Sequence, residues 1–251
     1  MKHIKHVIVL IGAVLVLGCD SENAFDCIQT AGDIIQEEVM LPEFQRILVN
    51  RDVELIIQQG DTQQVIIETG ENLINDVKAE VNGDRLILTD DNTCNYVRDY
   101  GITKVYVTSP NITEIRSSTQ YDISSQGVLA YNDLTLLSED FNAPGTFTVG
   151  DFRLNVATTA LTVVANNISF FYISGTTDAL SVGFFSGAGR FEGADLIAQD
   201  VDIFHRGSND MIVNPQQSLT GELRGTGDLI TLNQPPVIDI EQLFTGQLIF
   251  N

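Results

Sequence analysis

The chain has 251 residues, 43% of them hydrophobic, which is enough to fill a sizeable core in one large domain or two small ones. Its 34 acidic residues outnumber 13 basic ones and give a formal charge of −21 at pH 7. A charge this negative repels phosphate backbones and anionic lipid head groups, so nucleic acid is excluded as a partner.

Residues 1–18 have the pattern of a bacterial lipoprotein signal peptide. Lys2 and Lys5 precede an apolar run over residues 7–17, which is shorter than the roughly 20 residues that a membrane-spanning helix needs. The run ends at Gly18 and Cys19 in a sequence that resembles a lipobox, whose cysteine is lipidated and becomes the new N-terminus. An ordinary signal peptide followed by a chance cysteine is the alternative.

Removal of residues 1–18 would leave 11 basic residues (13 less Lys2 and Lys5) against 34 acidic ones, a formal charge of −23. Membrane attachment is therefore expected through acyl chains on Cys19, because the protein lacks the excess of basic residues that would bind a membrane surface. We expect the protein in the envelope of a gram-negative bacterium, on the outer membrane at its periplasmic face or at the cell surface.

Two further cysteines, Cys27 and Cys94, remain in the mature chain. An even pair outside the cytoplasm is most simply a disulfide, although two buried free thiols are the alternative. A metal site or cofactor is not expected, because the mature chain has one histidine and no Cys-x-x-Cys motif.

After a lipidated tether over residues 19–40, the sequence predicts one β domain over residues 41–251. Its first part, residues 41–110, is predicted to consist of antiparallel strands. The runs over 47–49, 53–58 and 65–68 are rich in β-branched residues, and Asn82-Gly83-Asp84 is a strong hairpin signal.

Residues 111–251 carry a repeated turn pattern. Gly175 to Asp178, Gly207 to Asp210 and Gly225 to Asp228 each begin with glycine and end with aspartate three residues later, before an alternating apolar run. The step from Gly187 to Gly207 is 20 residues and that from Gly207 to Gly225 is 18, which suits stacked coils. The sequence therefore predicts a β-solenoid, similar to a parallel β-helix. The shorter step from Gly175 to Gly187 indicates either different corners of one coil or a shortened coil.

The clearest predicted strands of this part alternate apolar and polar residues with period two, so one face of each should line a core. They lie at residues 134–136, 147–149, 154–156, 161–163 and 248–250.

Several segments resemble the GIN-domain family of auto-transporter adhesin head lipoproteins. They are Glu71 to Leu73, Cys94 to Arg98, Val105 to Pro110 and Gly225 to Asp228. The resemblance runs from about Glu37 to the C-terminus. It implies a β-helix-like domain that is usually lipid-anchored, it suggests that Cys27 and Cys94 belong together, and it implies no catalytic residues.

Catalysis has few candidates in this sequence. His205 would have to serve any catalytic triad, but no Gly-x-Ser-x-Gly motif accompanies it, so we expect a surface or partly packed histidine. The acidic pairs Glu37–Glu38, Asp90–Asp91 and Glu139–Asp140 could supply carboxylates for glycoside hydrolysis, but adjacent residues of a strand point to opposite faces.

The candidate ligand contacts are instead Phe184, Phe185, Arg206, Asp210, Arg224 and Asp228. Of two adjacent phenylalanines in a strand, one must point outward or pack under a loop. The Arg–Asp pairs recur after 18 residues and are expected to stack on one corner, either as a small ligand site or as turn-stabilising residues.

We expect a non-enzymatic binding or adhesion module that recognises a glycan or an envelope protein. The alternatives are a glycoside hydrolase or lyase on the same scaffold, and a structural envelope protein.

Overall fold

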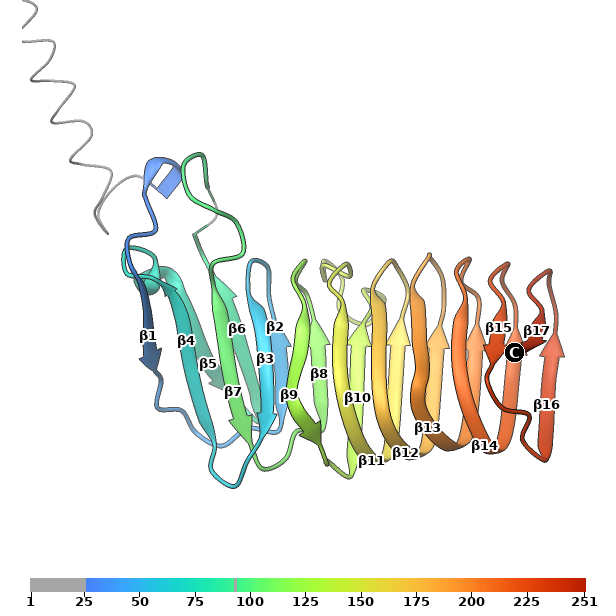
Figure 1. Ribbon diagram of the computed structural model, residues 1–251. Helices are drawn as coiled ribbons and strands as arrows, with labels where there is room; N and C mark the ends of the chain where they lie inside the picture. The colour runs from blue at the N-terminus through green and yellow to red at the C-terminus, as the bar shows by residue number, and fades with distance from the viewer. Residues whose placement is uncertain (1–25, 93) are drawn as a thin grey trace, which may run out of the picture.

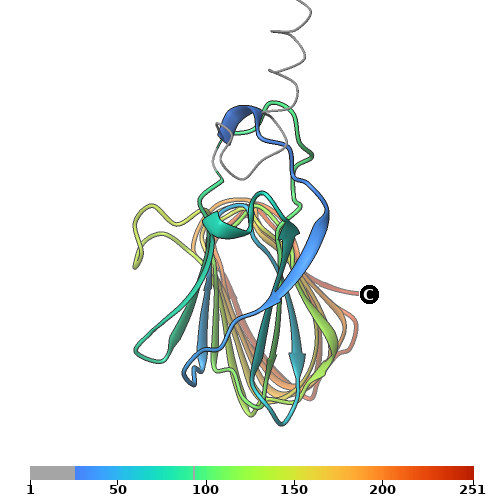
Figure 2. The same ribbon diagram turned by 90° about the vertical axis from the view of Figure 1, so that its left-hand side faces the viewer.

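The computed structural model describes residues 26–92 and 94–251, so Cys19 and the predicted signal peptide lie outside the described residues. These ranges form an all-β fold in which seventeen strands make one mixed sheet that curls on itself (Figures 1 and 2). The helices η1 (Asp26–Ile28) and η2 (Ile74–Asp76) are single 3-10 turns. Over the two described ranges, no helix has the length and apolar character needed to cross a membrane.

The curled sheet has two facing sides, and the long strands β11 to β14 bend so that each contributes to both. The first side contains, in order, β1 (Ile34–Glu38), β4 (Gln64–Gly70), β7 (Lys104–Ser109), β3 (Glu54–Gln59), β9 (Ile123–Leu129), the first halves of β11 (Phe152–Ala165), β12 (Phe170–Phe184), β13 (Arg190–His205) and β14 (Met211–Leu223), then β15 (Leu229–Thr231) and β17 (Leu248–Phe250). The second side contains β5 (Val77–Asn82), β6 (Arg85–Asp90), β2 (Arg46–Val49), β8 (Glu114–Ser117), β10 (Asp133–Ser138), the second halves of β11 to β14, and β16 (Val237–Gln242).

The prediction of antiparallel strands over residues 41–110 is confirmed for β4–β7 and β5–β6 but is wrong for β2–β6 and β3–β7, which are parallel. Among the described strands only β1–β4, β4–β7 and β5–β6 are antiparallel, whereas β2 and β3 each pair with two parallel neighbours. The error has a physical cause: alternation of apolar and polar residues is the same in both kinds of ladder. The hairpin at Asn82 is confirmed, because Asn82 pairs with Arg85 and Gly83 has a φ of 65°.

The second half is a continuous parallel ladder. Phe152 pairs in register with Phe171, Phe171 with Phe191, and Phe191 with Met211. These side chains are fully buried between the two sides, and the rings of Phe152 and Phe171 stack with their centroids 4.9 Å apart. Each strand therefore buries its apolar face against its neighbours, as repeat architectures do. The strand predicted at 147–149 is a turn instead, and β17 confirms the one predicted at 248–250.

The glycine loops that follow the long strands stack on one another. The N–H of Ser208 donates to the carbonyl of Gly187, that of Gly227 to Gly207, and that of Gly246 to Gly225. Gly175 does not belong to this set, because it lies inside β12 with a φ of 106°. The short step from Gly175 to Gly187 therefore connects two different corners of the folded chain, the bend within β12 and the loop after it.

Candidate functional site

The second halves of β12, β13 and β14 present an outer face on which polar and aromatic residues alternate with buried ones. On β13, Asp200, Asp202 and Phe204 point outward because Val201 and Ile203 between them are 1% exposed. In register with Phe204 lie Gly183 of β12 and Glu222 of β14. The outer face is therefore made of side chains that are aligned in rows across the three strands.

Three phenylalanines form a cluster on this face, which we call the aromatic shelf: Phe141, Phe185 and Phe204. The ring of Phe185 stacks on that of Phe204 with centroids 4.9 Å apart, and Phe141 meets Phe185 edge-on at 5.6 Å. Phe141 is 50% exposed and Phe185 40%. The guanidinium of Arg224 lies 6.0 Å from the Phe204 ring centroid and forms an ion pair with Glu222. Stacked rings that are partly exposed in this way offer apolar area that a partner can cover.

The loop over residues 139–147, which carries Phe141, projects from the side of the curled sheet (Figure 2). Its base is anchored by Glu139, whose side chain is 1% exposed. The Glu139 carboxylate lies 2.7 Å from the guanidinium of Arg116 and accepts the N–H of Asn142 at 2.8 Å. A buried ion pair holds this end of the loop, and with it Phe141, in place.

Beside the aromatic shelf, the same face is hollowed into a shallow outer groove of about 220 Å³. Its polar lining comes from Thr162, Ser181, Asp200, Asp202, Ser218 and Thr220. The hydroxyl of Ser218 donates to Asp200 at 2.6 Å, and that of Thr220 donates to Asp202 at 3.0 Å. The carboxylates keep further acceptor positions, so the groove can accept hydrogen bonds from the hydroxyls of a ligand.

The structure places the predicted contact residues in different environments. Phe184 is fully buried beside Phe171, so it does not reach the surface, whereas Phe185 lies in the aromatic shelf. Arg224 lies next to the shelf, and Arg206 is exposed on the loop that contains Gly207.

Asp210 and Asp228 stabilise the stacked loops. The carboxylate of Asp210 accepts the backbone N–H of Asp228 at 3.1 Å, and that of Asp228 accepts the N–H of Gln247 at 2.8 Å. Asp210 also pairs with Arg190 at 3.2 Å. Within residues 26–92 and 94–251 no three His, Cys, Asp or Glu side chains gather closely enough to hold a metal ion. Each of these aspartates thus caps the next loop of the stack.

His205 is fully buried, which corrects the expectation of a surface or partly packed side chain. The N–H of Gly207 donates to its Nδ1 at 3.4 Å, and the ring meets that of Phe184 edge-on. Burial lowers the pKa of His205 below its ordinary value. A neutral imidazole enclosed in the core has no access to a substrate.

The acidic pairs also fail to converge. Asp91 is exposed and pairs with Lys78, whereas Asp90 is buried in a polar pocket. Glu139 is buried with Arg116, and Asp140 is exposed. Partners within these two pairs therefore lie in different surroundings, which agrees with their expected opposite orientations, whereas Glu37 and Glu38 are both exposed on β1.

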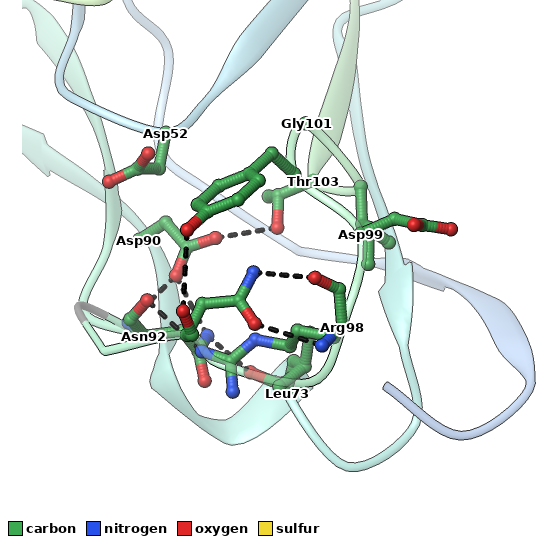
Figure 3. A pocket seen from close by; sticks show the side chains of 11 residues that line it. Asp52, Leu73, Asp90, Asn92, Arg98, Asp99, Gly101 and Thr103 are labelled. Atoms are coloured by element: carbon green, nitrogen blue, oxygen red, sulfur yellow. Dashed lines mark hydrogen bonds between the residues drawn. The ribbon is translucent and has the colours of Figure 1, made fainter. Parts of the chain in front are cut away.

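A small polar pocket of about 60 Å³ lies between Asp90, at the end of β6, and the loop that leads from Asn92 to Thr103 (Figure 3). Asp90 accepts hydrogen bonds from the Thr103 hydroxyl at 2.6 Å, from the Asn92 N–H at 2.8 Å and from the Asn92 side chain at 2.7 Å. Burial raises the pKa of Asp90. Because its oxygens already bind these donors, Asp90 acts as a structural link between β6 and β7.

Sequence reasoning missed Phe141, Phe204 and the outer groove. Phe204 carried a usable signal, because it alternates with Val201 and Ile203 and therefore points outward if they point inward. Phe141 gave none, since its place beside Phe185 depends on how a loop folds back.

The comparisons with known proteins agree with this fold. The family model described as "Putative auto-transporter adhesin, head GIN domain" matches residues 43–235. A crystal structure of a putative adhesin from Bacteroides fragilis is similar with a TM-score of 0.78 and 18% identity, covering 88% of this chain and 99% of that one. No curated protein matches the chain.

Two structures from Parabacteroides distasonis share the fold at lower similarity. One is a putative adhesin with a TM-score of 0.63 and 13% identity, covering 88% of this chain and 99% of that one. The other is a putative lipid binding protein with a TM-score of 0.61 and 16% identity, covering 88% and 97%. Because the family model spans most of the chain, the resemblance seen in the sequence is confirmed, and the protein belongs to the GIN-domain family of putative auto-transporter adhesin heads.

Proposed function

We propose that this protein is a lipid-anchored envelope lipoprotein that binds glycans, without catalysing a reaction, through the aromatic shelf and the outer groove. The observation that carries the proposal is the stack of Phe185 on Phe204 beside that groove. A sugar ring has an apolar C–H face and a rim of hydroxyls. The shelf offers aromatic area for the former, and Asp200 and Asp202 offer acceptors for the latter.

The charge of the outer face selects among glycans. Asp200, Asp202 and Glu222 all lie on it, and Asp239 and Glu241 continue the rows of Asp202 and Glu222 on β16. Among the arginines, Arg224 is already paired with Glu222. An anionic polysaccharide would be repelled, so the ligand is a neutral or amine-bearing glycan.

The anchored location is supported by the sequence before Cys19 and by the adhesin family. We further infer that residues 111–251 are a β-solenoid, which is supported by the parallel register from Phe152 through Met211 and by the stacked loops. Such a scaffold is rigid and suits lateral contact with an extended ligand.

A lipid ligand, as named for the Parabacteroides distasonis protein, would have to bind elsewhere than between the two sides. That space is filled by side chains such as Phe152, Phe171 and Phe191, each fully buried. We therefore place the ligand on the outer face.

The test is an array of neutral, amine-bearing and anionic glycans, probed with the native chain, Phe185→Ala and Phe244→Ala. Phe244 is a matched control, because it is 61% exposed and lies on a loop beyond β16. We expect binding to neutral or amine-bearing glycans that is lost in Phe185→Ala and kept in Phe244→Ala.

A depolymerisation assay on each bound glycan accompanies the array. Turnover that disappears in Asp202→Asn would replace the binding function with an enzymatic one. Equal binding by the two phenylalanine variants, or binding to none of the glycans, would also overturn the proposal; the last result favours a structural envelope protein.

A further inference from the structure

Four large apolar side chains are exposed at the N-terminal end of the fold. Tyr96 is 80% exposed, Tyr100 77%, Val97 56% and Ile28 42%. They belong to what we call the hook, residues 26–30 and 94–102, which stands above one end of the curled sheet in both views (Figures 1 and 2). A group of exposed apolar residues of this size indicates a contact surface.

The two segments of the hook are held together by covalent and hydrogen bonds. Cys27 is bonded to Cys94, which confirms the predicted disulfide, and the N–H of Tyr96 donates to the carbonyl of Cys27 at 3.0 Å. These links hold the segment that carries Ile28 against the segment that carries Tyr96 and Val97.

The side chain of Asn95 fixes the shape of the loop. Its Oδ1 accepts the N–H of Val97 at 3.2 Å and of Arg98 at 2.9 Å, and its Nδ2 donates to the Arg98 carbonyl at 2.8 Å. The Tyr100 hydroxyl donates to the carbonyl of Asn95 at 3.3 Å. The exposed side chains therefore project from a braced loop.

The position of the hook along the chain points to its partner. Cys19 precedes Cys27 by eight residues, and a fully extended chain of that length reaches at most about 28 Å. If Cys19 carries acyl chains, the hook is confined within that distance of the bilayer. The membrane interface is then the apolar surface present at the highest local concentration.

We propose that the hook is a membrane-interface contact, in which Ile28, Tyr96, Val97 and Tyr100 insert at the head-group boundary and orient the domain on the bilayer. This inference rests on the lipid anchor of the proposed function. Tyrosine suits the boundary because its ring is apolar and its hydroxyl is polar. The exposed carboxylate of Asp99 lies in the same loop, so zwitterionic head groups are preferred over anionic ones.

The composition of the chain allows a clean test. It contains no tryptophan, so Tyr96→Trp and Phe244→Trp each introduce a single tryptophan, whose emission is separable from that of the tyrosines. It has three cysteines, of which Cys27 and Cys94 are bonded, so a maleimide-linked lipid couples to Cys19. The mature chain from Cys19 onward is coupled in this way and bound to phosphatidylcholine vesicles that contain brominated lipid.

We expect a blue-shifted emission for Tyr96→Trp and at least threefold stronger quenching than for Phe244→Trp. The quenching of Tyr96→Trp should weaken when the anionic lipid phosphatidylglycerol is added to the vesicles. Equal and weak quenching of the two reporters on vesicle-bound protein would overturn the hook as a membrane contact.

Natural lipidation is measured separately, by comparing membrane partitioning of the native protein with that of Cys19→Ala in cells. Partitioning unchanged by Cys19→Ala would overturn the lipid anchor. The coupled lipid supplies the anchor in the vesicle experiment, so the two failures are distinguishable.

Discussion

The ring of Phe185 lies over the backbone of Gly183. A Cβ built at Gly183 would stand 2.8 Å from Cε2 of that ring, closer than real side chains approach one another. Gly183 is in register with Phe204, so its missing side chain leaves the space in which Phe185 can stack on Phe204. The aromatic shelf therefore depends on a glycine as much as on its phenylalanines.

Gly183→Ala should displace the shelf without harming the fold. The Phe185 ring is partly exposed and can move, and alanine is favoured over glycine inside a strand, so the free energy of unfolding should change by less than about 1 kcal/mol. Displacing the ring removes apolar area that a sugar would cover, at about 25 cal/mol per Å², so the loss of roughly 30–50 Å² of contact should lower glycan affinity roughly threefold to tenfold. Titration calorimetry with the best array glycan, beside urea unfolding, measures both. Unchanged affinity would show that the stack does not contact the ligand.

Local alternation predicted much of the strand content but little of the pairing. The strands at 134–136, 154–156 and 161–163 follow from period-two patterns, and the stacking of the loops at Gly207 and Gly225 follows from their 18-residue step. The parallel direction of the β2 and β3 ladders could not be predicted from these local patterns, because it depends on partner strands that are far away in the sequence.

The candidate site was predictable only in part, for a similar reason. Alternation requires that Phe184 and Phe185 face opposite ways, but it does not decide which of them is buried. Which of the two is buried depends on the register of β12 against β13, in which Phe184 pairs with His205 and faces the interior. The contribution of Phe141 depends on a loop anchored by Glu139, for which no periodic signal exists.

The buried His205 should make stability depend on pH in a defined window. Burial lowers its pKa in the folded state below the ordinary value of 6.5, so the unfolded chain binds a proton more readily. The stabilisation by the neutral ring is thus complete above pH 6.5 and is lost as the pH falls from there toward the folded pKa, by at most about 1.4 kcal/mol per pH unit.

Urea unfolding at about pH 7.5, 6 and 5 tests this dependence in the native protein and in His205→Gln. Gln is a suitable replacement because it keeps a polar group but does not titrate. We expect the native protein to lose stability faster than the variant on acidification. Parallel pH profiles would mean that His205 does not titrate differently in the two states.

Alanine substitutions at two glycines measure separately how much stability is lost to backbone strain and how much is lost to steric crowding. Gly221 has a φ of 129°, and a Cβ there would stand 1.9 Å from the carbonyl oxygen of Ile203, whereas Gly127 has a φ of 84° and nothing within 4 Å. Gly127→Ala should cost about 1–2 kcal/mol from strain alone. Gly221→Ala should cost about 2–5 kcal/mol, because the ladder between β13 and β14 must also move apart. Equal losses in denaturant unfolding would contradict close packing at Gly221.

The disulfide between Cys27 and Cys94 should stabilise the protein mainly by restricting the unfolded chain. It closes a loop with a sequence separation of 67 residues, for which the loop-entropy model gives about 4 kcal/mol. Cys27→Ser with Cys94→Ser should therefore lower the free energy of unfolding by up to about 4 kcal/mol, and residues 94–102 should gain faster amide exchange than the strands β11 to β14. Hydrogen exchange followed by mass spectrometry resolves the two regions. The contacts of the disulfide confine its effect to the hook and the strands beneath it. Equally faster exchange in β11 to β14 would instead mean that the disulfide supports the whole ladder.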